Sequence, residues 1–269
     1  NGGGGSGSGT PKKSLVEIYD DKKKRREEDS EIVLRFNQKP KAGIAYATKC
    51  RHIDSSDPAD VARFLHKNKD RFEKTQIGEY LGREPEYDNG MPLKVLHEYV
   101  HQMDFDGLVF DNAIRYYLSG FRLPGEAQKI DRILEKFAER YSEQNPDAFP
   151  SADVAFILSF SIIMLNTDLH NPSIKEERKM TKDGFIRNNR GICDGQDLPR
   201  EMLIQIFDRI RENPISLKED DDARERVADS SRTGNALSPA VFFTNHYDEM
   251  DRTKESNFTK ERDQIVRTT

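Results

Sequence analysis

One unusually apolar segment constrains the fold of this chain more than any other feature. Between residues 152 and 165 the only polar side chains are Asp153, Ser159 and Ser161. A helix with one face in water carries polar residues along that face. This segment must therefore be covered nearly all round, or be covered on one side and offer an apolar groove on the other. The pattern favours a central core helix, and an apolar groove remains the alternative.

Two more helices flank a Pro-Gly break in the middle of the chain. Apolar residues recur at spacings of three and four on both sides: Ala113, Ile114, Tyr117, Leu118 and Phe121 before it, and Ile130, Ile133, Leu134, Phe137 and Tyr141 after it. Pro124 and Gly125 must separate the two helices, so Glu126 opens the second one. The free amide N–H groups and the positive end of the dipole favour a carboxylate there. We expect a fixed, exposed acid, although an ordinary first-turn dipole partner has the same pattern.

The rest of the chain also indicates helices joined by short turns. Asp57 followed by Pro58 places a capping acid before a proline at a first helical position. Residues 75–81 and 200–213 carry apolar residues at helical spacing, and no run alternates with period two for long enough to indicate a strand. The fold class predicted is all-α.

A possible zinc motif lies within residues 93–103. His97, Glu98 and His101 match H-E-x-x-H, in which two histidines one helical turn apart hold zinc and the glutamate acts as general base. Zinc hydrolysis needs a third ligand, and no histidine follows until His170. The interpretation we favour is a helix with Leu96 facing the core and the histidines on its more polar side, with no metal bound.

Charge and composition suggest three segments. Residues 1–30 are a Gly/Ser-rich stretch followed by dense charge, and they are expected to form a flexible charged linker, with a solvated helix as one form of its second half. Residues 31–217 are the predicted globular domain. Residues 218–269 read as an acidic linker and a tail that could pack back on the domain.

The same composition narrows the classes of partner and compartment. With 43 basic and 48 acidic residues the net charge is -5, which gives no reason to expect nucleic acid as the main partner. Two cysteines and the lack of an apolar run near about 20 residues favour a reducing, cytoplasmic compartment without a transmembrane span. Peripheral membrane attachment through other regions of a longer protein stays open.

Several runs of sequence resemble one known family. Residues 121–131 closely resemble the signature of the Sec-seven domain family, the guanine-nucleotide exchange factors for Arf GTPases. Residues 165–172, and residues 189–192 with 197–200, look like its second and third signature stretches; residues 36–41 and 77–82 resemble further landmarks. The matches span about residues 36–217 in the right order, and the large Golgi-type, brefeldin-A-related subfamily is favoured over the small cytohesin type.

This resemblance implies a fold and a function. The fold would be an elongated right-handed stack of about ten helices with a partner-binding groove. Glu126 would be the catalytic glutamic finger that displaces Mg²⁺ and the β-phosphate from an Arf-family GTPase, with no cofactor and no covalent chemistry. The groove residues that bind the switch regions would be Phe156, Phe160, Ile163 and Met164, with Asn171 as a polar contact. A helical adaptor that binds without exchange is the alternative, and the setting would be Golgi or endosomal membranes.

The resemblance also covers the site of the inhibitor brefeldin A. In the family, sensitivity follows a few positions that line a cavity in the stalled complex. Here Ser161, Asp168 and Met180 look like the sensitive pattern, whereas Phe160 stands where sensitive members usually have Tyr. We expect weaker inhibition than in a Phe160→Tyr variant.

Overall fold

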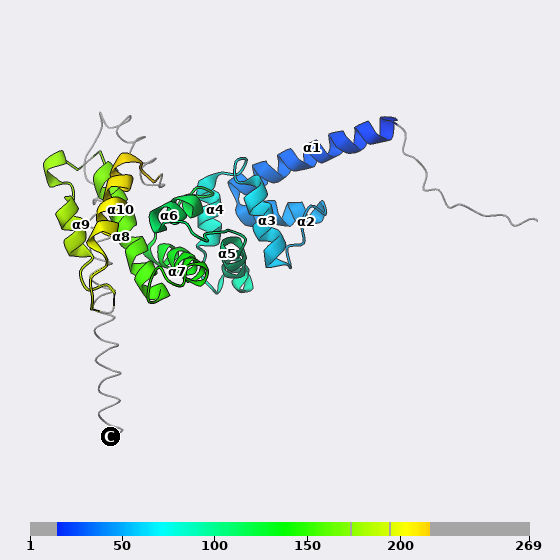
Figure 1. Cartoon of the computed structure of the whole chain (residues 1–269). Coiled ribbons are helices and arrows are strands. Elements are labelled where there is room, and N and C mark those ends of the chain that lie inside the picture. Colours follow the sequence, from blue (N-terminus) through cyan, green and yellow to red (C-terminus); the bar gives the residue numbers. More distant parts are fainter. Residues whose placement is uncertain (1–14, 173, 194, 216–269) are drawn as a thin grey trace, which may run out of the picture.

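The computed structural model describes residues 15–172, 174–193 and 195–215. Over these residues the chain forms ten α-helices and two short 3-10 turns, and no strand longer than an isolated bridge. The predicted all-α class is therefore confirmed. Figure 1 shows the helices stacked side by side into an elongated body, with the N-terminal helices at one end and the last two at the other. The expected segment 218–269 lies outside the described residues.

The helices of the N-terminal half are α1 (Leu15–Gln38), α2 (Pro40–Lys49), α3 (Pro58–Asn68), α4 (Lys74–Leu81) and α5 (Met91–His101), with the 3-10 turn η1 (Tyr87–Gly90) before α5. Those of the second half are α6 (Phe110–Leu118), α7 (Ala127–Gln144), α8 (Ala152–His170), α9 (Lys182–Asn188) and α10 (Arg200–Glu212), with η2 (Glu176–Arg178) before α9.

Local signals in the sequence set several of these boundaries. The Asp57 carboxylate accepts a hydrogen bond from the Ala59 amide at 2.9 Å, so α3 begins with the predicted cap followed by proline. The Thr181 hydroxyl caps α9 in the same way, accepting from the Gly184 amide at 3.1 Å. The starts of α3 and α9 are therefore set by the residues next to them in sequence.

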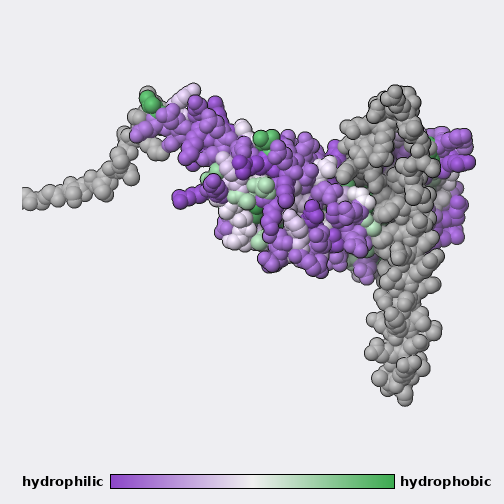
Figure 2. Space-filling model, turned by 180° about the vertical axis from the view of Figure 1, so that it is seen from behind, coloured by the Kyte–Doolittle hydropathy of each residue, from purple (hydrophilic) through white to green (hydrophobic). Residues whose placement is uncertain are grey.

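Helix α1 crosses the boundary expected at residue 30. Its first half is exposed and highly charged, and its packed half begins at Ile32, which is buried together with Phe36 against α2 and α4. The first half projects from the body in Figure 1, and the face drawn in Figure 2 is mostly hydrophilic along it. Residues 15–30 are therefore helical, which is the solvated-helix form expected for the second half of the charged linker.

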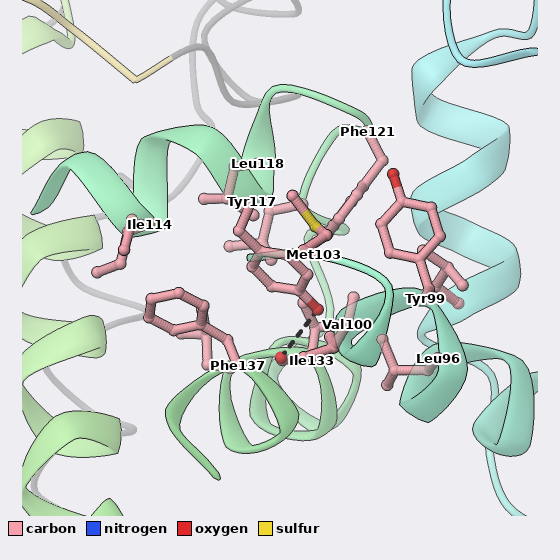
Figure 3. Packing of buried hydrophobic residues seen from close by; sticks show 14 of the residues in the cluster. Leu96, Tyr99, Val100, Met103, Ile114, Tyr117, Leu118, Phe121, Ile133 and Phe137 are labelled. Atoms are coloured by element: carbon pink, nitrogen blue, oxygen red, sulfur yellow. Dashed lines mark hydrogen bonds between the residues drawn. The ribbon is translucent and has the colours of Figure 1, made fainter. Parts of the chain in front are cut away.

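An aromatic cluster between α5, α6 and α7 forms the centre of the core (Figure 3). Tyr117 is fully buried, stacks on Phe137 with ring centroids 5.3 Å apart, and donates a hydrogen bond from its hydroxyl to the Ile133 carbonyl at 3.2 Å. Phe121 packs edge-on against Tyr117 and Tyr99. The core therefore runs directly beneath the turn that joins α6 to α7.

Helix α8 is the core helix that its composition predicted. Most of its apolar side chains are buried, including Val154, Leu158, Ile162 and Ile163, while Phe156 and Met164 are only partly covered. It packs against α7, α9 and α10. By length and composition alone this helix could cross a membrane. However, 67% of its most apolar 18-residue stretch is buried inside the fold, as in a core helix.

Candidate functional site: the turn between α6 and α7 and the exposed edge of α8

The turn that joins α6 to α7 (residues 119–126, the finger turn) is held rigidly from below. Phe121 and Leu123 are buried, and the Arg122 amide donates a hydrogen bond to the Lys74 carbonyl at 3.0 Å. Helix α4 lies so close that an ideal Cβ on Gly78 would fall 1.9 Å from the Arg122 carbonyl oxygen. Only glycine allows this approach, so α4 fixes the backbone of the turn.

Glu126 occupies the end of this turn, as predicted. It is the N-cap residue of α7, in extended conformation (φ -96°, ψ 126°), and its side chain is 69% exposed. The carboxylate forms no capping hydrogen bond to the helix amides. A first-turn acid that served only its own helix would point back at those amides. The Glu126 carboxylate is instead an exposed acid on a fixed backbone.

The contact of this carboxylate is a buried lysine one helical turn along α7. The Lys129 ammonium lies 2.8 Å from Glu126 Oε1 and 2.7 Å from Glu79 Oε2, and its side chain is only 7% exposed. Burial alone would lower the pKa of Lys129, but the hydrogen bonds to Glu126 and Glu79 raise it, so the ammonium stays charged. Sequence reasoning missed Lys129 and Glu79; the i,i+3 spacing of Glu126 and Lys129 was the available signal.

The five residues expected to bind a partner differ in how accessible they are. Phe156 and Met164 are partly exposed on α8. Phe160 and Ile163 are 3% and 0% exposed, so they lie inside the fold, with Phe160 packed edge-on against Phe156 at 5.1 Å between ring centroids. Asn171 is 6% exposed at the C-terminal end of α8. The exposed edge of α8 is therefore narrower than the expected set.

The four residues expected to line an inhibitor pocket lie on α8, which carries Phe160, Ser161 and Asp168, or in the loop that follows it, which carries Met180. Ser161 is buried on α8, and seven residues later the Asp168 carboxylate accepts a hydrogen bond from the Met180 amide. Burial raises the pKa of Asp168, and the hydrogen bond from Met180 and the charge of Lys179 oppose that rise only in part. The structure thus brings Asp168 and Met180 into direct contact, and the assignment of the four residues to one inhibitor pocket stays a prediction.

The histidine pair of the H-E-x-x-H run lies on α5, with the His97 and His101 ring centroids 4.1 Å apart. Burial and the neighbouring His97 lower the pKa of His101. Within the described parts of the chain, no group of three or more His, Cys, Asp or Glu side chains is placed to hold a metal ion. The pair has the helix register of a zinc motif without a third ligand among those residues.

The fold and this site together define a class of protein: an elongated all-helical module that presents one exposed carboxylate on a rigid turn beside a buried apolar helix. A profile of the Sec7 domain matches residues 25–215, and the chain belongs to this family. The resemblance seen in the signature runs is thereby confirmed.

Curated relatives and solved structures agree with this membership. The chain is 54% identical over 185 residues to brefeldin A-inhibited guanine nucleotide-exchange protein 3 of Arabidopsis thaliana, which is 69% of this chain and 10% of that protein. It is 48% identical over 186 residues to the ADP-ribosylation factor guanine nucleotide-exchange factor sec72 of Schizosaccharomyces pombe, again 69% of this chain and 10% of the relative. The chain thus spans about a tenth of the length of these relatives.

Among solved structures, the Sec7p catalytic domain superposes with a TM-score of 0.64 at 40% identity, covering 78% of this chain and all of that one. A Sec7 domain bound to ARF1-GDP and complexed with brefeldin A gives a TM-score of 0.65 at 39% identity, covering 72% of this chain and 97% of that chain.

Proposed function

We propose that this chain is a guanine-nucleotide exchange factor that accelerates GDP release from an Arf-family small GTPase, with Glu126 as its catalytic residue. The single observation that carries the assignment to Glu126 is its carboxylate, 69% exposed at the end of a turn whose backbone is fixed by buried side chains. The relatives' names supply the reaction, and the ARF1-GDP complex of a related Sec7 domain supplies the class of partner.

The mechanism follows from charge. A small GTPase holds its nucleotide through Mg²⁺ and a P-loop lysine on the phosphates. A carboxylate inserted there repels the β-phosphate, competes for the lysine and disfavours Mg²⁺. Two unit charges about 4 Å apart interact by roughly 4 kcal/mol at an effective dielectric constant near 20, enough for about a thousandfold in release rate. No covalent bond changes, and the exchange factor supplies no cofactor.

The apolar edge of α8 is the proposed binding surface for the GTPase switch regions. Phe156 and Met164 offer the accessible area, and Phe160, on which Phe156 packs, and Ile163 are buried behind them. Asn171 lies at the end of the same helix as a polar contact. By thermodynamic linkage, a factor that weakens nucleotide binding in this way must bind nucleotide-free GTPase more tightly than the loaded form.

The proposed inhibitor pocket consists of Phe160, Ser161, Asp168 and Met180. The contact between Asp168 and Met180 supports a common site, and the relatives' names record inhibition by brefeldin A. The cellular setting proposed is the cytoplasmic surface of Golgi or endosomal membranes, reached by peripheral association through other regions of a longer protein. The first thing to determine is which member of the Arf family is the GTPase partner.

The decisive experiment follows release of a fluorescent GDP analogue from truncated Arf in excess GTP. Wild type should accelerate release, and Glu126→Lys should abolish the acceleration while complex formation with Arf survives. The matched control is Glu135→Lys, which reverses the charge of an exposed acid on α7 and should retain exchange activity. If wild type binds but accelerates release of no Arf, a helical adaptor without exchange activity replaces this proposal.

A further inference from the structure

Lys129 differs from the other charged side chains of α7 in how it is held. Its ammonium is shared between Glu79 of α4 and Glu126 of the finger turn, at 2.7 and 2.8 Å, with 7% of the side chain exposed. Lys136, which pairs with Glu139 on the same helix at 2.6 Å, keeps 23% exposed. Lys129 is therefore a nearly buried cation whose second partner is the proposed catalytic carboxylate.

The packing of α4 prevents Lys129 from following Glu126 outward. An ideal Cβ on Gly82 would lie only 2.8 Å from the Lys129 Cβ, so the end of α4 lies against the lysine stem. The Arg132 guanidinium, one turn further along α7, donates to the Gly82 carbonyl at 2.6 Å and holds the two helices together at this point. The Lys129 stem is thus packed against α4 and its side chain is nearly buried, whereas the carboxylate that its ammonium contacts is exposed.

We propose that Lys129 is a positioning residue for Glu126. It holds the catalytic carboxylate in one orientation at the end of the finger turn and offsets its charge in the free domain. This inference rests on the proposed function and deepens it. A glutamate side chain left without such a partner samples several rotamers, and the freedom lost on entering the nucleotide site then slows the exchange step.

The pair is also weak enough to be given up. Because Glu126 is largely exposed, its ion pair is screened by water on one side and costs little to break. On entering the nucleotide site the carboxylate exchanges the Lys129 ammonium for the cations around the phosphates, and Lys129 keeps Glu79 as its partner. A buried lysine with a single carboxylate would be left unpaired at that step, and the second carboxylate prevents this.

The kinetic test compares Lys129→Met with Lys136→Met, which removes the other ammonium of an i,i+3 pair on α7. Lys129→Met should lower kcat for nucleotide release by about tenfold, the scale of fixing one glutamate side chain, with KM for Arf unchanged. Lys136→Met should match wild type, and Lys129→Arg should recover most of the loss. Equal rates for the two methionine variants, a faster Lys129→Met, or a rise in KM alone would each overturn the proposal.

A second measurement is independent of exchange. In protein labelled with ¹⁵N-lysine, the Lys129 ammonium should give a slowly exchanging NMR signal that is absent in Lys129→Met and shifts in Glu126→Gln. An unshifted signal in Glu126→Gln would show that Lys129 does not hold the carboxylate. If wild type gives this shift but accelerates no GDP release, the pair stands and the proposed function fails, so the two failures are distinguishable.

Discussion

Replacing Gly78 by alanine tests whether α4 fixes the finger turn. The new Cβ would lie 1.9 Å from the Arg122 carbonyl oxygen and 3.0 Å from its carbonyl carbon, and both atoms belong to the backbone. Ordinary van der Waals contact begins at 3.4 Å, so α4 and the turn must separate by about 1.5 Å. The Arg122–Lys74 hydrogen bond and the buried Phe121 ring resist that movement.

The change in the free energy of unfolding combines two opposing effects. Overpacking costs about 1–3 kcal/mol, and replacing a helical glycine by alanine returns about 0.5–1 kcal/mol. The net loss is therefore up to about 2.5 kcal/mol, which in a domain of this size lowers Tm by up to about 10 °C. Because Glu126 stands on the displaced turn, the rate of nucleotide exchange should also fall, by up to about 100-fold for a shift near 1 Å. Thermal melting followed by circular dichroism and GDP-release kinetics measure the two effects.

Gly184→Ala is the matched control within a helix. A Cβ there would lie 3.2 Å from the Thr181 hydroxyl and 3.6 Å from Met180 Cγ, both of them side-chain atoms. Its Tm should be unchanged or slightly raised, because alanine favours the helix. A Gly78→Ala protein as stable as Gly184→Ala would refute the idea that α4 holds the turn by close approach.

Three other outcomes are expected. Asn166→Ala should lower the free energy of unfolding by about 2–4 kcal/mol in denaturant titrations, because the buried amide and carbonyl of Ile215, now bonded to Asn166 at 2.6 and 2.9 Å, lose their partner. Burial lowers the pKa of His66, which stacks on Tyr99, below the ordinary histidine value of 6.5 that applies in the unfolded chain. The unfolded chain therefore binds more protons than the folded one once the pH drops below about 6.5, so the free energy of unfolding should fall there. His66→Gln should show a smaller fall in Tm than wild type between pH 7.5 and 5.5. Phe160→Tyr should be inhibited more strongly by brefeldin A than wild type, and equal inhibition of both in the GDP-release assay would contradict the pocket assigned.

Much of the fold was predictable because helix signals are local. The cap at Asp57, the break at Pro124 and the buried stripes need only neighbouring residues to be read. The predicted helices over 75–81 and 200–213 appear as α4 and α10 with boundaries within one residue. The core role of α8 also followed from composition, since no wetted helix carries so few polar residues.

The sequence by itself determined the all-α class, the position of Glu126 at the start of a helix, and the family through its signature runs. Only the tertiary structure decided which side chains cover the apolar faces of α8, so that Phe160 and Ile163 lie inside and Phe156 remains partly exposed. It also brought Glu79 and Lys129, 50 residues apart, onto one another beside Glu126. The physical reason is that helix formation depends on neighbours in sequence, whereas burial and ion pairing depend on which helices pack together.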